Sequence, residues 1–312
     1  MTRPAIGSLF TAALAVTATA GQPPAPQEPP TLRTSVAAVT IDAWVHHRHV
    51  AIEGLTARDF IVRDNGVERL VNSIGTTDSV HAIVVLDVSG SVTGDAGAAL
   101  RDALQRFLSL LTARDRLSLV TFGDRVRVHA VAEAPARVDA DDITTLPTVG
   151  STTLLDALLV SSQLARADDR PAMLLLFTDG ADTASWTPAG HVIAALRRTS
   201  VVVCAVGAGV PNVVPAHAES EYFKTTSWLA ATPRDTLGLL RHVTETTGGE
   251  LLRLDERADV GDAFVNILGR YRQRYLLSFT LPEGVTSGWH RLDVRLRNHR
   301  GIVVARQGYM AP

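Results

Sequence analysis

The strongest constraint on the fold of this chain is an apolar run that ends abruptly in a cluster of oxygen-bearing side chains. Residues 83–86 are aliphatic and mostly β-branched, which is typical of a strand buried on both faces. Beyond residue 94 apolar residues recur at helical spacing, namely Ala99, Leu100, Ala103, Leu104, Phe107, Leu108 and Leu111. Residues 87–91 are therefore predicted to form a turn between a strand and a helix. In an open parallel sheet such a turn lies at the carboxyl end of the strand, where ligands bind.

The predicted turn carries side chains that suit a hard cation. Asp87, Ser89 and Ser91 supply one carboxylate and two hydroxyls, with no sulfur or imidazole among them. Oxygen-only sets favour Mg²⁺ or Mn²⁺, whereas a zinc site would favour cysteine or histidine. Because three oxygens do not complete such a site, other segments must contribute further ligands.

Two later segments are predicted to bring oxygen ligands to the same edge of the sheet. Thr152 precedes a second helical pattern, and Asp179 follows a buried strand predicted at residues 173–177. Aspartate and hydroxyl residues after a strand are also ordinary turn and helix-capping residues, so each segment alone has a plain structural interpretation. The presence of all three segments in this order favours a metal site. Residues 83–91 match neither a phosphate loop nor a nucleophile elbow.

Taken together, these segments resemble the von Willebrand factor type A (VWA) domain and its metal-ion-dependent adhesion site, over residues 80–272. Asp87, Ser89 and Ser91 match the Asp-x-Ser-x-Ser element, Thr152 matches the isolated threonine, and Asp179 matches the aspartate of Thr-Asp-Gly. The usual Gly-Gly-Thr is Gly-Ser-Thr here, and the threonine is retained. The resemblance implies that these five side chains hold Mg²⁺ or Mn²⁺ and leave one position for an acidic residue of a partner protein.

Both ends of the chain outside this domain have β-strand patterns. Residues 34–76 contain an Asp-Asn-Gly hairpin signal at residues 64–66, with strands predicted on either side at residues 60–63 and 67–74. In residues 274–312, apolar and charged residues alternate from 291 to 296, as in a strand with one solvated face. Both segments also resemble the corresponding parts of VWA-related proteins of acidobacteria.

The predicted fold class is thus α/β. It consists of a doubly wound, mostly parallel sheet with helices on both faces, plus a small β-sandwich in which residues 34–76 pair with residues 274–312. A few strands from one terminus make a poor core alone, which is the physical reason for pairing the two ends.

The first residues are predicted to direct export. Residues 1–20 have a basic start, an apolar stretch too short to span a membrane and a small-residue cleavage site, as in a signal peptide. Residues 21–33 are predicted to form a proline-rich linker. We therefore expect a periplasmic or extracellular protein without a stable membrane anchor. A formal net charge of -2, without a Lys/Arg-rich run, argues against a nucleic-acid partner.

A histidine cluster and the cysteine are two further candidates for chemical sites. His46, His47 and His49 could suit a metal, but they fall where a turn is expected, which favours a solvated loop. Cys204 is the only cysteine and lies in an apolar run, which indicates an inert core thiol.

Three other features lie near the predicted site. Residues 209–232 form a long aromatic-containing connection, either a recognition loop or a packed insertion. Asp124 and Asp182 could approach the metal, although a surface carboxylate is the expected role of Asp182.

The function that these observations predict is binding without catalysis. The protein would be an exported module that presents a divalent cation to an acidic residue of an unknown protein partner. Two alternatives stay open: a scaffold in which the metal only braces loops, and a metal-assisted hydrolase that uses the open metal position.

Overall fold

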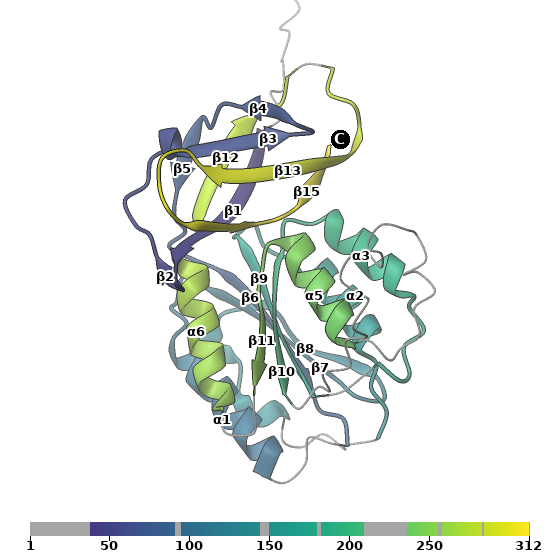
Figure 1. The fold of residues 1–312 in the computed structure, drawn as a ribbon. Helices are drawn as coiled ribbons and strands as arrows, with labels where there is room; N and C mark the ends of the chain where they lie inside the picture. Colours follow the sequence, from purple (N-terminus) through teal and green to yellow (C-terminus); the bar gives the residue numbers. More distant parts are fainter. Residues whose placement is uncertain are drawn as a thin grey trace, which may run out of the picture. The chain divides into compact units, whose positions relative to one another are not determined.

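The computed structural model describes residues 38–90, 95–143, 150–179, 182–208, 236–254, 258–282 and 284–311. Six strands of this part form one sheet in the order β11-β10-β9-β6-β7-β8, parallel except for the edge strand β8 (Figure 1). The bounds are β6 His81–Asp87, β7 Arg116–Phe122, β8 Val126–Glu133, β9 Ala172–Thr178, β10 Val202–Ala208 and β11 Leu251–Leu254. The doubly wound arrangement that the sequence predicts is confirmed.

Helices cover both faces of this sheet (Figure 1). The helices are α1 Asp95–Ser109, α2 Leu154–Leu164, α3 Ala189–Arg197, α5 Thr236–Thr247 and α6 Val260–Arg272. Helices α1 and α6 pack together on one face, whereas α3 contacts both α2 and α5 on the other. Short 3₁₀ helices occur at Pro135–Arg137 and Ala140–Ile143 after β8.

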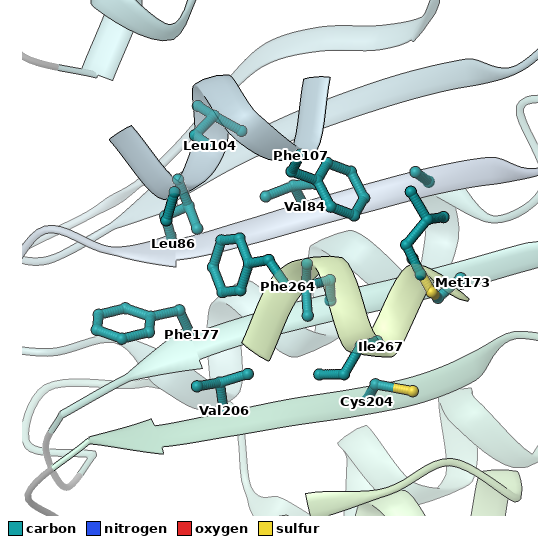
Figure 2. Packing of buried hydrophobic residues seen from close by; sticks show 14 of the residues in the cluster. Val84, Leu86, Leu104, Phe107, Met173, Phe177, Cys204, Val206, Phe264 and Ile267 are labelled. Atoms are coloured by element: carbon teal, nitrogen blue, oxygen red, sulfur yellow. The ribbon is translucent and has the colours of Figure 1, made fainter. Parts of the chain in front are cut away.

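The apolar central strands explain this layering. Because successive side chains of a strand point to opposite faces, Val84 and Leu86 join the core under α1 and α6, whereas Ile83 and Val85 join the core under the other helices. Figure 2 shows the first of these cores, in which Phe264 of α6 lies near Phe107 of α1 and Phe177 of β9. Strand β6 is apolar on both faces and therefore needs both cores to bury it. This is why it lies at the centre of the sheet.

Strands from the two ends of the chain pair with each other in two further sheets. The first has the order β14-β1-β12-β5 with β2 paired to β1, and the second has the order β15-β13-β3-β4. The strands are β1 Ala38–His47, β2 Val50–Ala51, β3 Phe60–Asp64, β4 Val67–Arg69, β5 Ser73–Gly75, β12 Tyr275–Thr280, β13 Gly288–Leu296, β14 Ile302–Ala305 and β15 Gly308–Ala311, with a 3₁₀ helix at Ala57–Asp59. One core joins residues of both sheets, so the terminal strands form a β-sandwich.

The hairpin predicted at residues 64–66 is present, but the strand after it differs from the prediction. Asn65 and Gly66 have φ values of 48° and 86°, as a tight two-residue turn between twisted strands requires. The strand predicted over residues 67–74 is divided: β4 pairs with β3 in one sheet, and β5 pairs with β12 in the other. The chain crosses between the sheets at the break, which a continuous β pattern does not reveal.

Two further features, helix α3 and the long connection at residues 209–232, can be compared with the sequence-based expectations. Helix α3 is not predicted from the sequence, and its N-cap, Pro188, makes no side-chain capping bond. The connection at residues 209–232 lies outside the described residues. In the part of the chain that the structure describes, no helix combines the length and apolar character that a membrane crossing requires.

Hydrogen bonds join the β-sandwich to the helix-covered sheet, and Val36–Pro312 forms one compact unit. Arg306 Nη2 donates to the Thr199 carbonyl at 2.7 Å, and Arg274 Nη2 donates to the Gly248 carbonyl at 2.5 Å. Both carbonyls lie just before the first residues of β10 and β11. The sandwich therefore contacts the amino edge of the parallel sheet, and the carboxyl edge is the opposite one.

Candidate functional site

The predicted ligands of β6 lie at the point where the strand order of the sheet reverses. Chain order runs one way from β6 to β8 and the other way from β9 to β11, so the reversal falls between β6 and β9. Asp87 is the last residue of β6 and Thr178 is the last residue of β9. Thr178 Oγ1 donates to Asp87 Oδ2 at 2.7 Å. In open α/β sheets this carboxyl-edge crevice is the usual place for a ligand.

The turn after β6 holds the Asp87 carboxylate in place. The Ser89 N–H donates to Asp87 Oδ1 at 2.9 Å, and both residues are buried. The Ser89 side chain donates to this carboxylate as well. Ser91, the third predicted ligand of this turn, lies outside the described residues.

Gly123, at the β7–β8 turn, links this turn to the segment that carries Thr152. Its carbonyl accepts from the Thr153 N–H at 2.9 Å. A Cβ on Gly123 would lie 3.5 Å from the Val88 carbonyl oxygen and 3.6 Å from Ser89 Cα. The backbones of the two predicted ligand segments therefore approach each other through one glycine.

Thr152 is also bonded to the segment that follows Asp179. Its N–H donates to Thr183 Oγ1 at 2.9 Å, and its carbonyl accepts from the N–H groups of Thr183 and Ala184 at 2.9 and 3.1 Å. The structure thus brings Asp87, Ser89, Thr152 and Asp179 to one edge of the sheet, as the sequence predicts. Their role as metal ligands stays a prediction.

Asp87 is a buried carboxylate without a counter-charge among the described residues. Asp87 is fully buried, and burial, together with the nearby charge of Asp179, raises the pKa of its carboxyl group although Thr178 and Ser89 donate to it. Among the described residues, no arginine or histidine forms an ion pair with Asp87. A buried carboxylate without a counter-charge is costly, and a divalent cation would supply that charge.

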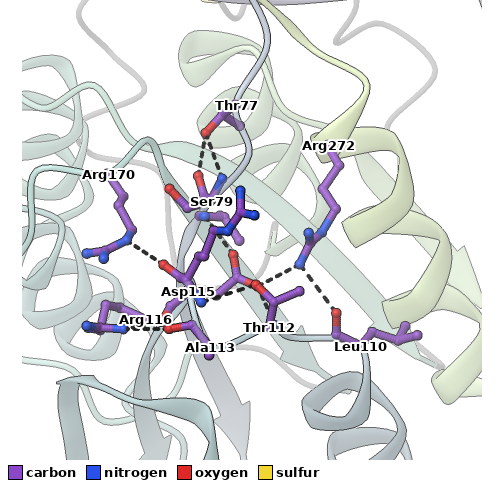
Figure 3. Close-up of polar contacts among 11 residues, drawn as sticks. Thr77, Ser79, Leu110, Thr112, Ala113, Asp115, Arg116, Arg170 and Arg272 are labelled. Carbon is purple, nitrogen blue, oxygen red and sulfur yellow. Dashed lines mark hydrogen bonds and ion pairs between the residues drawn. The ribbon is translucent and has the colours of Figure 1, made fainter.

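Asp115 is a second buried carboxylate next to the same sheet, and its surroundings can be compared with those of Asp87. It is equally buried, but it lies at the amino edge, just before β7 (Figure 3). Arg272 Nη2 lies 2.8 Å from its Oδ2, and the N–H groups of Thr112 and Val80 donate to its two oxygens at 2.6 and 2.9 Å. Burial alone would raise the pKa of Asp115, but these donors outweigh it and lower the pKa. Asp115 is thus a structural carboxylate with its own counter-charge, unlike Asp87.

Two carboxylates near the site differ from each other. Asp182 is buried, and it accepts from Ser185 Oγ at 2.5 Å and from the Leu155 N–H at 3.3 Å. The expectation of a surface role for Asp182 is therefore wrong: besides the nearby Ser185, its carboxylate bonds to the first turn of α2, which is far away in sequence. Asp124 is partly exposed and lies 3.3 Å from Arg125 Nε and 3.8 Å from Arg127 Nη2.

Sequence reasoning missed Asp156, which supports the segment after Asp179. Its carboxylate accepts from the N–H groups of Trp186 and Thr187 at 3.1 and 2.9 Å. Its position in the first turn of α2 is an ordinary helix-start signal, so the sequence offers no sign of this second role.

The histidine cluster forms the expected exposed turn at His47 and His49, but His46 differs from the expectation. His46 is buried in β1, where it stacks on Trp44 with ring centroids 4.1 Å apart. Arg48 and His49 form the turn, with φ values of 50° and 66°. Among the described residues, no group of three or more histidine, cysteine, aspartate or glutamate residues is placed to hold a metal. Cys204 is buried, and burial raises the pKa of its thiol to about 11, as expected of an inert core thiol.

Residues 82–181 match the family model of the von Willebrand factor type A domain. The chain contains a VWA domain. This match includes β6, β7 and β9 together with the turns that follow them, which are the elements of the candidate site.

Several known proteins are similar to parts of this chain. Over 118 residues the chain is 32% identical to inter-alpha-trypsin inhibitor heavy chain H4 of Sus scrofa, a match that covers 34% of this chain and only 13% of the pig protein. Among solved structures, a von Willebrand factor type A protein from Catenulispora acidiphila has a TM-score of 0.50 at 13% identity, over 83% of this chain and 74% of that one. Proximal thread matrix protein 1 from the mussel byssus, solved with a zinc-occupied adhesion-site motif, has a TM-score of 0.48 at 14% identity, over 67% of this chain and 49% of that one.

A VWA domain implies a role in protein interaction or adhesion, and proteins with this domain are mostly interaction modules and not enzymes. VWA domains also commonly bind a divalent metal at the adhesion-site motif. These general properties agree with the oxygen-rich edge formed by Asp87, Ser89, Thr152 and Asp179.

Proposed function

We propose that this protein is an exported, non-enzymatic interaction module that uses a divalent cation to bind an acidic residue of a partner protein. Asp87, Ser89, Ser91, Thr152 and Asp179 would hold the cation, and Mg²⁺ or Mn²⁺ suits their oxygen ligands. When bound, the cation supplies a Lewis-acidic position that an incoming carboxylate can occupy.

The observation that carries this proposal is the contrast between Asp87 and Asp115. Folding gives Asp115 the Arg272 counter-charge, whereas Asp87 is buried next to Asp179, with a raised pKa and no basic partner among the described residues. A protein that needed Asp87 only as a turn residue would gain stability from a neutral side chain there. A cation at this edge would account for the arrangement, and the hydrogen-bonded segments that carry Ser89 and Thr152 would orient their oxygens toward it.

The proposal can be tested without knowing the natural partner. Randomised peptides with one fixed aspartate are displayed and selected on the full chain in Mg²⁺, then eluted with EDTA. We expect Mg²⁺-dependent binders that lose affinity when their aspartate is replaced by asparagine. Peptides that bind equally well in EDTA would contradict the mechanism.

Two variants identify the site in the same experiment. Asp87→Asn should abolish Mg²⁺-dependent binding, because it removes a buried charge from the ligand set. Asp124→Asn is the matched control: it removes a partly exposed carboxylate at the adjacent β7–β8 turn, which already has arginine partners. If Asp87→Asn kept peptide binding and only lowered the melting temperature in Mg²⁺, the scaffold alternative would be supported instead.

A further inference from the structure

Trp186 is an exposed aromatic residue beside the candidate metal site. Its side chain is 94% exposed, whereas Trp44 is 4% exposed. Trp186 lies between β9 and α3, seven residues after Asp179 in the chain. An exposed indole forgoes roughly 2–3 kcal/mol of burial energy, so it contributes little to the stability of this fold. Large exposed aromatic residues are typical of binding surfaces.

The backbone that carries Trp186 is held firmly although its side chain is not. The Asp156 carboxylate accepts from the N–H groups of Trp186 and Thr187 at 3.1 and 2.9 Å, and Ser185 Oγ accepts from the Asp156 N–H at 3.2 Å. Three consecutive residues are thereby fixed to the first turn of α2. A residue on a rigid backbone loses less conformational entropy when it binds a partner.

A further hydrogen bond connects the Trp186 segment to the segment that carries the predicted ligand Thr152. The Ala184 N–H donates to the Thr152 carbonyl at 3.1 Å, and Trp186 is two residues further on. Two residues span at most about 7 Å of chain, so the indole is displayed within a few residue lengths of Thr152. An extended peptide advances about 3.3 Å per residue. One short peptide segment can therefore reach both the Trp186 indole and the candidate metal site at Thr152.

The charge of this region favours a protein segment over a membrane surface. Neither residues 150–165 nor residues 171–190 contain lysine or arginine, whereas they include Asp156, Asp179 and Asp182. An anionic lipid surface would be repelled here, because interfacial membrane binding usually combines aromatic residues with basic ones. An acidic peptide side chain would be repelled too, except at the cation itself.

We propose that Trp186 is the apolar anchor of the partner-binding surface. The partner is a protein segment that carries an aliphatic or aromatic residue within about three residues of the acidic residue that reaches the metal. The inference rests on the function proposed above and adds the second recognition element. The indole packs against the apolar side chain, while the cation takes the carboxylate.

The test uses peptides selected in Mg²⁺ with a fixed aspartate and randomised neighbours. We expect the selected peptides to be enriched in apolar residues near the aspartate. Trp186→Ala should weaken their binding about tenfold or more, as is typical when a central aromatic residue is truncated. Trp186→Phe should keep most of the affinity. Leu70→Ala, which removes an 81% exposed side chain in the β-sandwich, is the control and should have no effect.

The failure of this inference can be told apart from failure of the proposed function. Mg²⁺ binding by Trp186→Ala, measured by calorimetry, should equal that of the unmodified chain. Mg²⁺-dependent peptides that show no apolar enrichment and bind Trp186→Ala unchanged would overturn the anchor and leave the metal function standing. Peptide binding that ignores EDTA would overturn the metal function itself. A third outcome would favour a membrane surface and would also overturn the inference. In that case the unmodified chain sediments with anionic vesicles, Trp186→Ala does not, and Trp186→Ala still binds the peptides.

Discussion

At the scale of single residues, the surroundings of a buried carboxylate decide its role. Asp64, Asp87 and Asp115 are all fully buried. Asp64 and Asp115 have basic partners within 2.8 Å, and their pKa values are lowered despite burial. Asp87 has hydroxyl and N–H donors only, and its pKa is raised. The first two stabilise the fold, whereas Asp87 has no counter-charge among the described residues.

This contrast predicts opposite effects of two identical substitutions. In EDTA, Asp87→Asn should leave the free energy of unfolding unchanged or raise it, because a buried charge without a counter-charge is removed. Asp115→Asn should lower it by at least about 2 kcal/mol, because Arg272 and two backbone N–H groups lose a charged acceptor. Urea unfolding of both variants measures the difference. Similar destabilisation by both would show that Asp87 is structural.

His290 predicts a pH dependence of stability. Its Nδ1 lies 2.6 Å from Asp64 Oδ1, and its Nε2 lies 2.7 Å from the Thr286 carbonyl, so the protonated ring donates at both nitrogens. Burial alone would lower the pKa of His290, but these two hydrogen bonds raise it above 6.5. The stabilisation is therefore complete below about pH 6.5 and is lost as the pH rises through the folded-state pKa.

The measurement is the urea midpoint as a function of pH, for the unmodified chain and for His290→Gln. The midpoint of the unmodified chain should fall on the alkaline side of 6.5 more steeply than that of the variant. Parallel curves would mean that His290 is not protonated in the folded protein.

At the scale of elements, close backbone approaches fix how the strands and helices join. A Cβ on Gly249, between α5 and β11, would lie 1.9 Å from the Val203 carbonyl oxygen. Backbone atoms of β10 cannot move aside without disturbing the sheet. Only glycine therefore allows β11 to begin where it does, next to β10.

Gly249→Ala should accordingly destabilise the protein by about 3 kcal/mol or more, because the clash is with backbone. Gly269→Ala is the matched control, since a Cβ there meets nothing within 4 Å and alanine favours the interior of α6. It should raise stability by up to about 1 kcal/mol. Thermal unfolding of both variants measures the difference. A smaller loss of stability in Gly249→Ala than in Gly269→Ala would contradict this account.

Elements that depend only on residues close together in the sequence could be predicted from that sequence. The apolar runs of β6 and β9 and the turn at Asn65 follow from strand and turn chemistry alone. Other features depend on residues far away in sequence. Asp182 is buried and accepts from the Leu155 N–H of α2, and the break between β4 and β5 exists because each strand pairs in a different sheet. The convergence of Asp87, Thr152 and Asp179 was predicted only through strand order.

At the scale of the whole molecule, the two ends of the chain depend on each other. β1 pairs with β12 over six residue pairs and with β14 over four, all from the other end of the chain. Arg274 and Arg306 then join these strands to the carbonyls of Gly248 and Thr199. This arrangement leaves the carboxyl edge of the parallel sheet, with its candidate site, away from the sandwich contacts.

Hydrogen exchange tests this dependence. We expect the amide protons of β1 and β12 to be protected to the same extent and to exchange together, because neither strand can open without the other. In limited proteolysis, residues 34–76 should not be released as a folded fragment. Such a fragment, stable by itself, would contradict the pairing of the two ends.

The most direct test of the central claim is a calorimetric titration of the full chain with Mg²⁺ and Mn²⁺, alongside Asp179→Ala. Asp179 is the second carboxylate at the edge that holds Asp87, and its charge already raises the pKa of Asp87. We predict that one cation binds per chain and that binding vanishes in the variant. Binding of equal strength in Asp179→Ala, or no binding by the unmodified chain, would contradict a metal site at this edge.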